Sequence, residues 1–194
     1  VIAGPSGGGK TTLFRALLER FDHLALSVSD TTRPPRRVEK DGEQYCFLDR
    51  ATFEAGIEAG RYLEHAEVFG HYYGTSKDRV QALWDQGKDV ILEIDIQGAE
   101  QVAKSHPEAT SIFILPPSMA VLSQRLRDRG LDDEAVIERR LSEARTEIEA
   151  ARDFDWLVIN DEFERAFQEI SAIIEAWPTR GSRRQAEIEA LLAE

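Results

Sequence analysis

The chain has 194 residues, enough for one compact domain with a buried core, and its 24 Lys and Arg against 36 Asp and Glu give a formal net charge of −12. This acidity argues against an extended nucleic-acid-binding face, and no apolar run approaches the ~18 residues of a membrane span. The single cysteine, Cys46, excludes an internal disulfide and fits a reducing compartment. We therefore expect a cytoplasmic protein without nucleic-acid or membrane partners, which binds small anions in local pockets.

The first predicted elements are the end of a short apolar strand, a glycine-rich loop and a helix, all within VIAGPSGGGKTTLFRALLERF. The helix is indicated by Leu13, Ala16, Leu17 and Phe21, which recur on one face. The following sequence HLALSVSDTT predicts a second strand.

From Arg33 to about Arg79 the pattern is irregular, with a short strand at QYCFL and a helix near RATFEAGIEAG. The elements expected after it are, in order, a buried strand Val90–Ile96, a strand in TSIFILPPS, a helical segment Met119–Arg152, a strand in DWLVIND, a helix Glu162–Trp177 and a short amphipathic helix in the tail. Strands that alternate with helices indicate the α/β class, with a central parallel sheet flanked by helices and two inserted segments.

The glycine-rich loop matches the phosphate-loop pattern G-x-x-x-x-G-K-[ST] and lies between a strand and a helix, as that motif requires. Its residues are Gly4, Pro5, Ser6, Gly7, Gly8, Gly9, Lys10 and Thr11, with Thr12 directly after them. The backbone N–H groups and the helix N-terminus would bind the phosphates of a nucleoside triphosphate, Lys10 would reach the β- and γ-phosphates, and Thr11 would ligate Mg²⁺. The alternative is a glycine-rich turn that matches by chance.

A second candidate phosphate site lies in SVSDTTRPPRR, which is basic in an otherwise acidic chain. Arginine makes two-point hydrogen bonds to phosphate, and hydroxyls complete such a site, so Ser29, Arg33, Arg36 and Tyr45 can enclose a second phosphate. A solvated arginine turn is the alternative. A phosphoryl donor in the first site and a phosphorylated acceptor in the second would account for both.

Together these motifs resemble guanylate kinase, the family that phosphorylates GMP with ATP. The resemblance is carried, in chain order, by GPSGGGKTTL, SVSDTTRPPRR, DGEQYCFL, YLEHAEVFGHYYGTS, ILEIDIQGA, FILPPS and RLRDRG. It runs from Val1 to about Phe167 and implies the three-layer phosphate-loop fold, with an inserted lobe for the nucleoside monophosphate and a helical lid. In residue numbers it implies a core of 1–28, 81–118 and 151–194, a GMP lobe of 29–80 and a lid of 119–150.

The resemblance also implies roles for individual residues. The ligands of the GMP phosphate would be Ser29, Arg33, Arg36, Tyr45 and Tyr73. Glu64 would read guanine with Thr75 beside it, and the strand-end acid Asp95 would touch GMP or hold Mg²⁺ through water. The lid arginines Arg129 and Arg140 would join Lys10 and Arg36 in catalysis.

Chemistry agrees with a carboxylate for guanine, because the base presents donors at N1–H and its amino group. The residues alone leave Glu64 and Glu67 both available, and only the resemblance favours Glu64. The alternatives are a solvated glutamate and, for Asp95, a buried structural aspartate. Three positions depart from the family's pattern: Thr12, Asp30, whose acid lies beside the arginine cluster, and Arg37-Val38.

We therefore expect an ATP:GMP phosphotransferase of purine nucleotide metabolism, with dGMP as a second acceptor and Mg²⁺ as cofactor. Two other functions stay open: a protein-interaction module without catalysis, and a phosphate-loop kinase of another phosphorylated small molecule. Intact Lys10 and Thr11 argue against the first, and the set Tyr45, Glu64 and Tyr73 argues against the second. The sequence leaves open whether the protein is a monomer or a homodimer.

Overall fold

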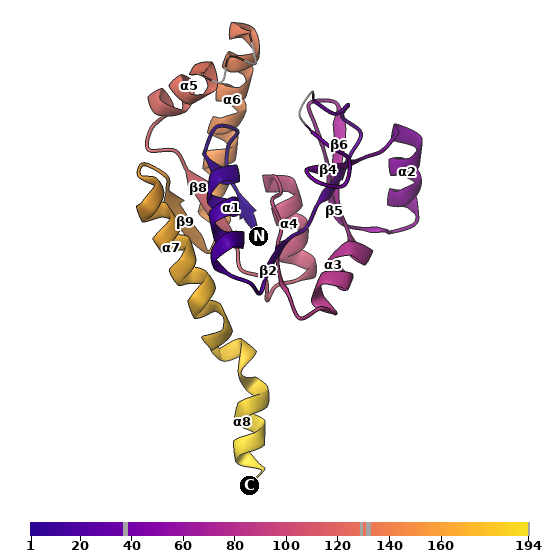
Figure 1. The fold of residues 1–194 in the computed structure, drawn as a ribbon, viewed down its shortest axis with the longest axis vertical. Coiled ribbons are helices and arrows are strands. Elements are labelled where there is room, and N and C mark those ends of the chain that lie inside the picture. Colours follow the sequence, from indigo (N-terminus) through magenta and orange to yellow (C-terminus); the bar gives the residue numbers. More distant parts are fainter. Residues whose placement is uncertain (37–38, 129, 131–132, 194) are drawn as a thin grey trace. The chain divides into compact units, whose positions relative to one another are not determined.

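The computed structural model describes residues 1–36, 39–128, 130 and 133–193 (Figure 1). The chain forms two compact units. Unit 1 contains Val1–Ala3 and Leu18–Ser111, and unit 2 contains Gly4–Leu17 and Ile112–Glu194. Among the helices in the described ranges, none is both long and apolar enough to cross a membrane.

Unit 1 is built from short strands and three complete helices. In chain order these are β1 (Ile2–Ala3), β2 (Leu24–Leu26), β3 (Ser29–Thr31), β4 (Tyr45–Phe47), α2 (Arg50–Glu58), β5 (Tyr62–Val68), β6 (His71–Ser76), α3 (Lys77–Trp84), β7 (Asp89–Ile91) and α4 (Ile96–Ser105). Strands β2 and β7 pair in parallel, whereas β4, β3, β6 and β5 form a four-stranded sheet in that order. A side-chain oxygen caps each helix: Asp49 for α2, Ser76 for α3 and Asp95 for α4.

The register of the four-stranded sheet decides which side chains share a face. Strand β3 pairs in parallel with β4, so that Ser29 lies opposite Tyr45, and antiparallel with β6, so that Thr31 lies opposite Tyr73. Strand β5 pairs with β6 so that Glu64 lies opposite Thr75. Because neighbouring residues of a strand point to opposite sides, the side chain of Asp30 lies on the face opposite that of Ser29 and Thr31.

Helices cover both sides of this sheet (Figure 1). On one side Phe53 of α2 stacks on Tyr62 and Tyr72, with ring centroids 4.4 and 5.2 Å apart. On the other side α4 lies along β5, and Gln101 exchanges hydrogen bonds with the backbone of His65. A buried cluster of Val80, Leu92 and Val102 packs α3 and α4 together.

Unit 2 carries the glycine-rich loop and most of helix α1 (Lys10–Arg20), whose buried residues are Leu13, Phe14 and Leu17. Its other elements are β8 (Ile112–Leu115), α5 (Met119–Asp128), α6 (Glu134–Ala150), β9 (Trp156–Ile159), α7 (Phe163–Ala176) and α8 (Gln185–Leu192), with single 3₁₀ turns at Ala151–Asp153, Trp177–Thr179 and Gly181–Arg183. Strands β8 and β9 pair in parallel from Ile112 opposite Trp156 to Leu115 opposite Ile159. Helices α5 and α6 meet through Leu122, Leu126, Ile137 and Ala144.

Parallel strand pairs with helices between them confirm the predicted α/β class. Two predicted strands need correction. HLALSVSDTT forms β2 and β3 in two different sheets, with a break at Ser27 and Val28. The strand predicted at Val90–Ile96 ends at Ile91, apart from one bridge at Glu93, because Asp95 caps helix α4, which starts at Ile96.

Candidate functional site

The glycine-rich loop of unit 2 turns tightly before α1 and is fastened to the end of β9. Asn160, which follows β9 and is buried, donates from Nδ2 to the carbonyl of Gly8 at 2.7 Å. Gly9 has φ +90°, and a Cβ there would lie 2.2 Å from the same Nδ2 atom. Only glycine therefore fits between the loop and its anchor.

Lys10 is the first residue of α1, and its side chain folds back over the loop. The ammonium donates to the carbonyl of Gly4 at 2.6 Å and to that of Pro5 at 3.3 Å. A cation at a helix N-terminus opposes the helix dipole, so this placement does not favour the helix. It does bring positive charge to a loop whose N–H groups are suited to phosphate. Thr11 and Thr12 follow with exposed side chains.

Arg140 of α6 reaches the same loop within unit 2. Its Nη1 donates to the hydroxyl of Ser6 at 3.4 Å, although the two residues are 134 positions apart. The structure thus brings one of the two predicted lid arginines to the phosphate loop. Arg129, the other one, lies outside the described residues.

In unit 1 the register collects most of the predicted acceptor residues on one face of the four-stranded sheet. Ser29 pairs with Tyr45, Thr31 with Tyr73, and Glu64 with Thr75, and the alternation of each strand points these side chains to the same side. The rings of Tyr45 and Tyr73 meet edge to face with centroids 5.9 Å apart. We call this side of the sheet the acceptor face.

Glu64 is almost fully buried on the acceptor face, with 3% of its surface exposed. The hydroxyl of Thr75 donates to Glu64 Oε1 at 2.6 Å. A Cβ on Gly98 of α4 would lie 2.3 Å from Glu64 Oε2, so the glycine leaves room for the carboxylate. Burial, with a smaller contribution from the charge of Asp95, raises the pKa of Glu64 to about 7, although the hydrogen bond from Thr75 lowers it. Glu67, in contrast, is half exposed and lies 3.9 Å from Arg50, which makes Glu64 the more suitable residue to read a base.

Asp95 serves α4 as its N-cap. Its Oδ1 accepts from the backbone N–H of Gly98 at 2.8 Å, and its Oδ2 accepts from Gln97 at 3.2 Å. The carboxylate is therefore fixed beside Glu64 by the start of the helix. Within the described part of the chain, no three His, Cys, Asp or Glu side chains gather as a metal site.

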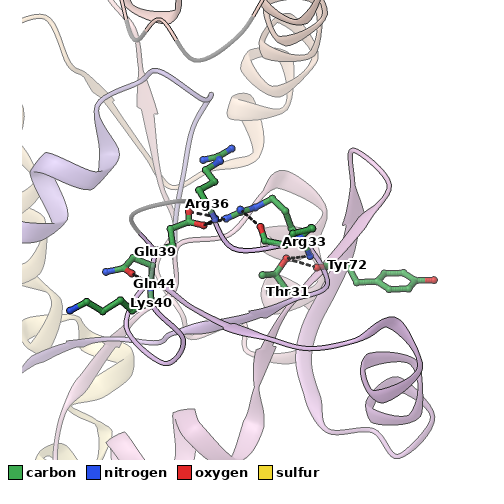
Figure 2. Close-up of polar contacts among 8 residues, drawn as sticks. Thr31, Arg33, Arg36, Glu39, Lys40, Gln44 and Tyr72 are labelled. Carbon is green, nitrogen blue, oxygen red and sulfur yellow. Dashed lines mark hydrogen bonds and ion pairs between the residues drawn. The ribbon is translucent and has the colours of Figure 1, made fainter.

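The arginine cluster after β3 is organised by Glu39, which the sequence did not single out (Figure 2). Arg33 Nη2 donates to both oxygens of Glu39 at 2.9 Å, and Arg33 Nη1 donates to the carbonyl of Pro34 at 2.7 Å. The backbone N–H of Arg36 also donates to Glu39, at 2.7 Å, whereas its guanidinium extends away from that carboxylate. Despite partial burial, hydrogen bonds from the Arg36 backbone and from Arg33 hold the pKa of Glu39 below its usual value.

Arg33 also joins the arginine cluster to the acceptor face. The guanidinium of Arg33 lies 5.4 Å from the ring centroid of Tyr45, within range of a cation–π contact. Burial, with smaller contributions from the charges of Glu93 and Tyr73, raises the pKa of Tyr45 to about 12. The Tyr45 hydroxyl therefore keeps its proton at neutral pH and can donate to a phosphate oxygen.

Besides Glu39, three residues with clear structural roles at these sites escaped the sequence reasoning. Asn160 anchors the loop, and Arg125 Nη2 in turn donates to the carbonyl of Asn160 at 3.0 Å. Gly98 makes room for Glu64. All three act through contacts between distant positions, and the only local signal was the polar Asn160 directly after an apolar strand.

The phosphate-loop motif and the α/β arrangement assign the chain to the phosphate-loop nucleotide-binding proteins as a class. A sequence profile described as guanylate kinase matches residues 1–177. The chain is 50% identical over 194 residues to a guanylate kinase of Alkalilimnicola ehrlichii, covering all of this chain and 94% of that protein. It is 52% identical over 193 residues to a guanylate kinase of Chromohalobacter salexigens, covering all of this chain and 90% of that protein.

A solved structure agrees with the sequence comparisons. The crystal structure of guanylate kinase from Anaplasma phagocytophilum matches with a TM-score of 0.81 and 34% identity, over all of this chain and 92% of that one. The chain belongs to the guanylate kinase family. The resemblance and the fold class inferred from the sequence are thereby confirmed, and the two alternative functions are not favoured.

Proposed function

We propose that this protein transfers the γ-phosphoryl group of ATP to GMP, and to dGMP, giving ADP and GDP in purine nucleotide metabolism. The observation that carries the proposal is the acceptor face, where buried Glu64 and its partner Thr75 lie on the same side of one sheet as Ser29, Tyr45 and Tyr73. Family membership supports the same reaction.

The donor would bind to unit 2. The N–H groups of the loop Gly4 to Gly9 and of the N-terminus of α1 would donate hydrogen bonds to the phosphates of ATP, and Lys10 would leave the carbonyls of Gly4 and Pro5 for phosphate oxygens. Arg140, which already touches the loop at Ser6, would stabilise the negative charge of the transferring group.

Magnesium fits the residues at the start of α1. The exposed hydroxyl of Thr11 is the kind of oxygen ligand that Mg²⁺ takes together with phosphates and water. When bound, the ion would neutralise charge on the phosphates and help to align them. Asp95 is the N-cap of α4 in unit 1, and we propose that it would also hold Mg²⁺ through a bridging water.

The acceptor would bind to unit 1. The phosphate of GMP would take hydrogen bonds from Ser29, Tyr45, Tyr73 and the arginines Arg33 and Arg36, with Glu39 keeping Arg33 in position. Guanine would place its N1–H and amino donors on Glu64. Adenine would set a ring acceptor against the same carboxylate, which favours GMP over AMP.

The reaction needs no covalent intermediate, because phosphoryl transfer depends on alignment and charge neutralisation. We propose the division inferred from the sequence for these tasks: a core of 1–28, 81–118 and 151–194, a GMP lobe of 29–80 and a lid of 119–150. The lid would carry Arg129 and Arg140 and exclude water during transfer.

A nucleotide panel tests the proposal. ADP release would be measured with ATP and Mg²⁺ in the presence of GMP, dGMP, AMP, CMP, UMP or no acceptor. We expect rapid release with GMP and dGMP and background release otherwise. Equal release without acceptor would indicate an ATPase, and no release with any nucleotide would favour another acceptor or a binding module.

The raised pKa of Glu64 gives a prediction for pH. In the free protein Glu64 is protonated below pH about 7, but guanine needs the ionised carboxylate, so protonation competes with GMP binding. The KM for GMP should rise up to about tenfold per pH unit as the pH falls below 7. Glu64→Gln should lower kcat/KM for GMP at pH 8 by roughly tenfold to a hundredfold and should lose this part of the pH dependence.

The stability of the folded protein should change with pH in the opposite direction to GMP binding. A carboxyl group whose pKa is raised on folding stabilises the protein most below its unfolded pKa, and this contribution is lost as the pH rises through about 7. The difference in melting temperature, Glu64→Gln minus the unsubstituted protein, should therefore become more positive as the pH is raised from 5 to 8. Glu67→Gln is the matched control, since Glu67 is half exposed. If Glu67→Gln rather than Glu64→Gln impairs GMP turnover, the assignment of Glu64 is wrong.

A further inference from the structure

Asp30 is the acidic residue that the sequence placed beside the arginine cluster. The register puts its side chain on the face opposite the acceptor face, beside Cys46 and Gly74. The carboxylate is buried, with 8% of the side chain exposed. It therefore lies in the sheet that carries the acceptor residues but points away from them.

Arg79 of α3 neutralises this carboxylate. Its Nη2 donates to Asp30 Oδ1, and its Nε donates to the backbone carbonyl of Val28 at 3.2 Å. The hydroxyl of Tyr62 and the thiol of Cys46 face the same carboxylate: burial raises the pKa of both groups, and the negative charge of Asp30 adds to the rise. Since a buried charge without its partner is strongly destabilising, this ion pair matters more than an exposed one would.

The position of Arg79 in the chain gives the pair its significance. The four-stranded sheet and α2 form one continuous segment, which the chain enters after β2, at Ser27 and Val28, and leaves at Ser76, the cap of α3. Arg79 lies in the first turn of α3, and its backbone N–H donates to Ser76 Oγ at 3.4 Å. Its guanidinium bonds to the entering strand at Val28 and Asp30. One side chain thus fastens the entrance of the segment to its exit.

We propose that Arg79, through Asp30 and Val28, is a positioning residue for the acceptor site: it holds the sheet that carries Ser29, Tyr45, Glu64, Tyr73 and Thr75 in place on α3. The inference rests on the proposed function for its substrate. Asp30 does not repel the acceptor phosphate, because its carboxylate lies on the opposite face of the sheet and Arg79 balances its charge there. Loosening this attachment should disturb the acceptor residues and leave the phosphate loop unaffected.

The test compares Arg79→Gln, Asp30→Asn, the double variant and Arg79→Lys, with Arg61→Gln as the control for loss of an exposed positive charge in the same unit. Arg79→Gln should raise the KM for GMP about tenfold, while kcat and the KM for ATP change less than about twofold. Asp30→Asn should have a smaller effect, because an amide oxygen still accepts from Arg79. The double variant should recover part of the loss, since it leaves no buried charge.

Arg79→Lys keeps the charge but not the two-point geometry, so its KM for GMP should fall between those of the unsubstituted protein and Arg79→Gln. Amide hydrogen exchange without nucleotide provides a readout that is independent of activity. Exchange in peptides covering 28–31 and 77–80 should rise in Arg79→Gln and stay unchanged in Arg61→Gln.

Unchanged exchange, an unchanged KM for GMP, or an equal rise in the KM for ATP would overturn the proposed role of Arg79. Absence of GMP turnover in the unsubstituted protein would instead overturn the proposed function, and exchange would still decide on Arg79. Should Arg79→Gln fail to fold, Arg79→Lys and the double variant keep both comparisons available.

Discussion

Replacing Lys10 with alanine should reduce GMP-dependent ADP formation by on the order of a thousandfold, with the fold intact. The ammonium now lies on the carbonyls of Gly4 and Pro5, where bound phosphates would draw it away, and no other residue of the loop carries a positive charge. A cation at a helix N-terminus is unfavourable for the helix, so the substitution should cost little stability. Circular dichroism, thermal melting and the turnover assay on one preparation would measure both effects.

Lys88→Ala is the matched control, because Lys88 also donates to a backbone carbonyl, that of Asp22, but belongs to unit 1. Its turnover should stay close to that of the unsubstituted protein. Turnover in Lys10→Ala within a few fold of normal would mean that the loop does not bind the transferred phosphoryl group.

Arg140→Ala should lower kcat by on the order of a hundredfold, with the KM for GMP changed only modestly. Its Nη1 lies at hydrogen-bond distance from Ser6 of the loop, and under the proposed function it would contact the transferring phosphoryl group mainly in the transition state. Interactions made mainly in the transition state lower kcat when they are removed, while binding of the ground state is less affected. Steady-state kinetics with GMP and ATP varied in turn would separate these terms.

Arg139 provides the control for this substitution. It is the preceding residue of α6, 64% of its side chain is exposed, and it pairs with Glu143 four positions along the helix. Neighbouring helix residues point in different directions, and such exposed pairs contribute little, so Arg139→Ala should be nearly silent. Arg127 is less suitable because it bonds to Glu134 and so connects α5 to α6. Equal effects of Arg139→Ala and Arg140→Ala would argue that Arg140 is an ordinary surface charge.

The sequence singled out two candidate phosphate-binding segments because the signals of both are local. The loop from Gly4 to Thr11 has a fixed spacing, and apolar runs marked β8 and β9 within one or two residues. The gathering of Tyr45, Glu64 and Tyr73 on one face was expected only through the resemblance. Their separation along the chain gives no such indication until the register of β3 to β6 is known.

Tertiary contacts explain what the sequence did not predict. HLALSVSDTT has the pattern of one strand, but Leu26 ends the pairing of β2 with β7, and Ser29 begins the pairing of β3 with β4. The strand propensity of these residues gives no sign that the chain passes from one sheet to another. Ile96 continues an apolar run, yet Asp95 caps a helix there. The partners Asp30 and Arg79 are 49 positions apart, so nothing local to Asp30 indicated that its charge would be balanced.

The central claim is that the phosphoryl group lost by ATP arrives on GMP. Phosphorus NMR of ATP, GMP and Mg²⁺ with the protein follows this group directly. We expect the signals of the γ-phosphate and of GMP to decrease together while the signals of two diphosphates, ADP and GDP, grow in equal amounts. Growth of inorganic phosphate and ADP with the GMP signal unchanged would contradict the proposed function.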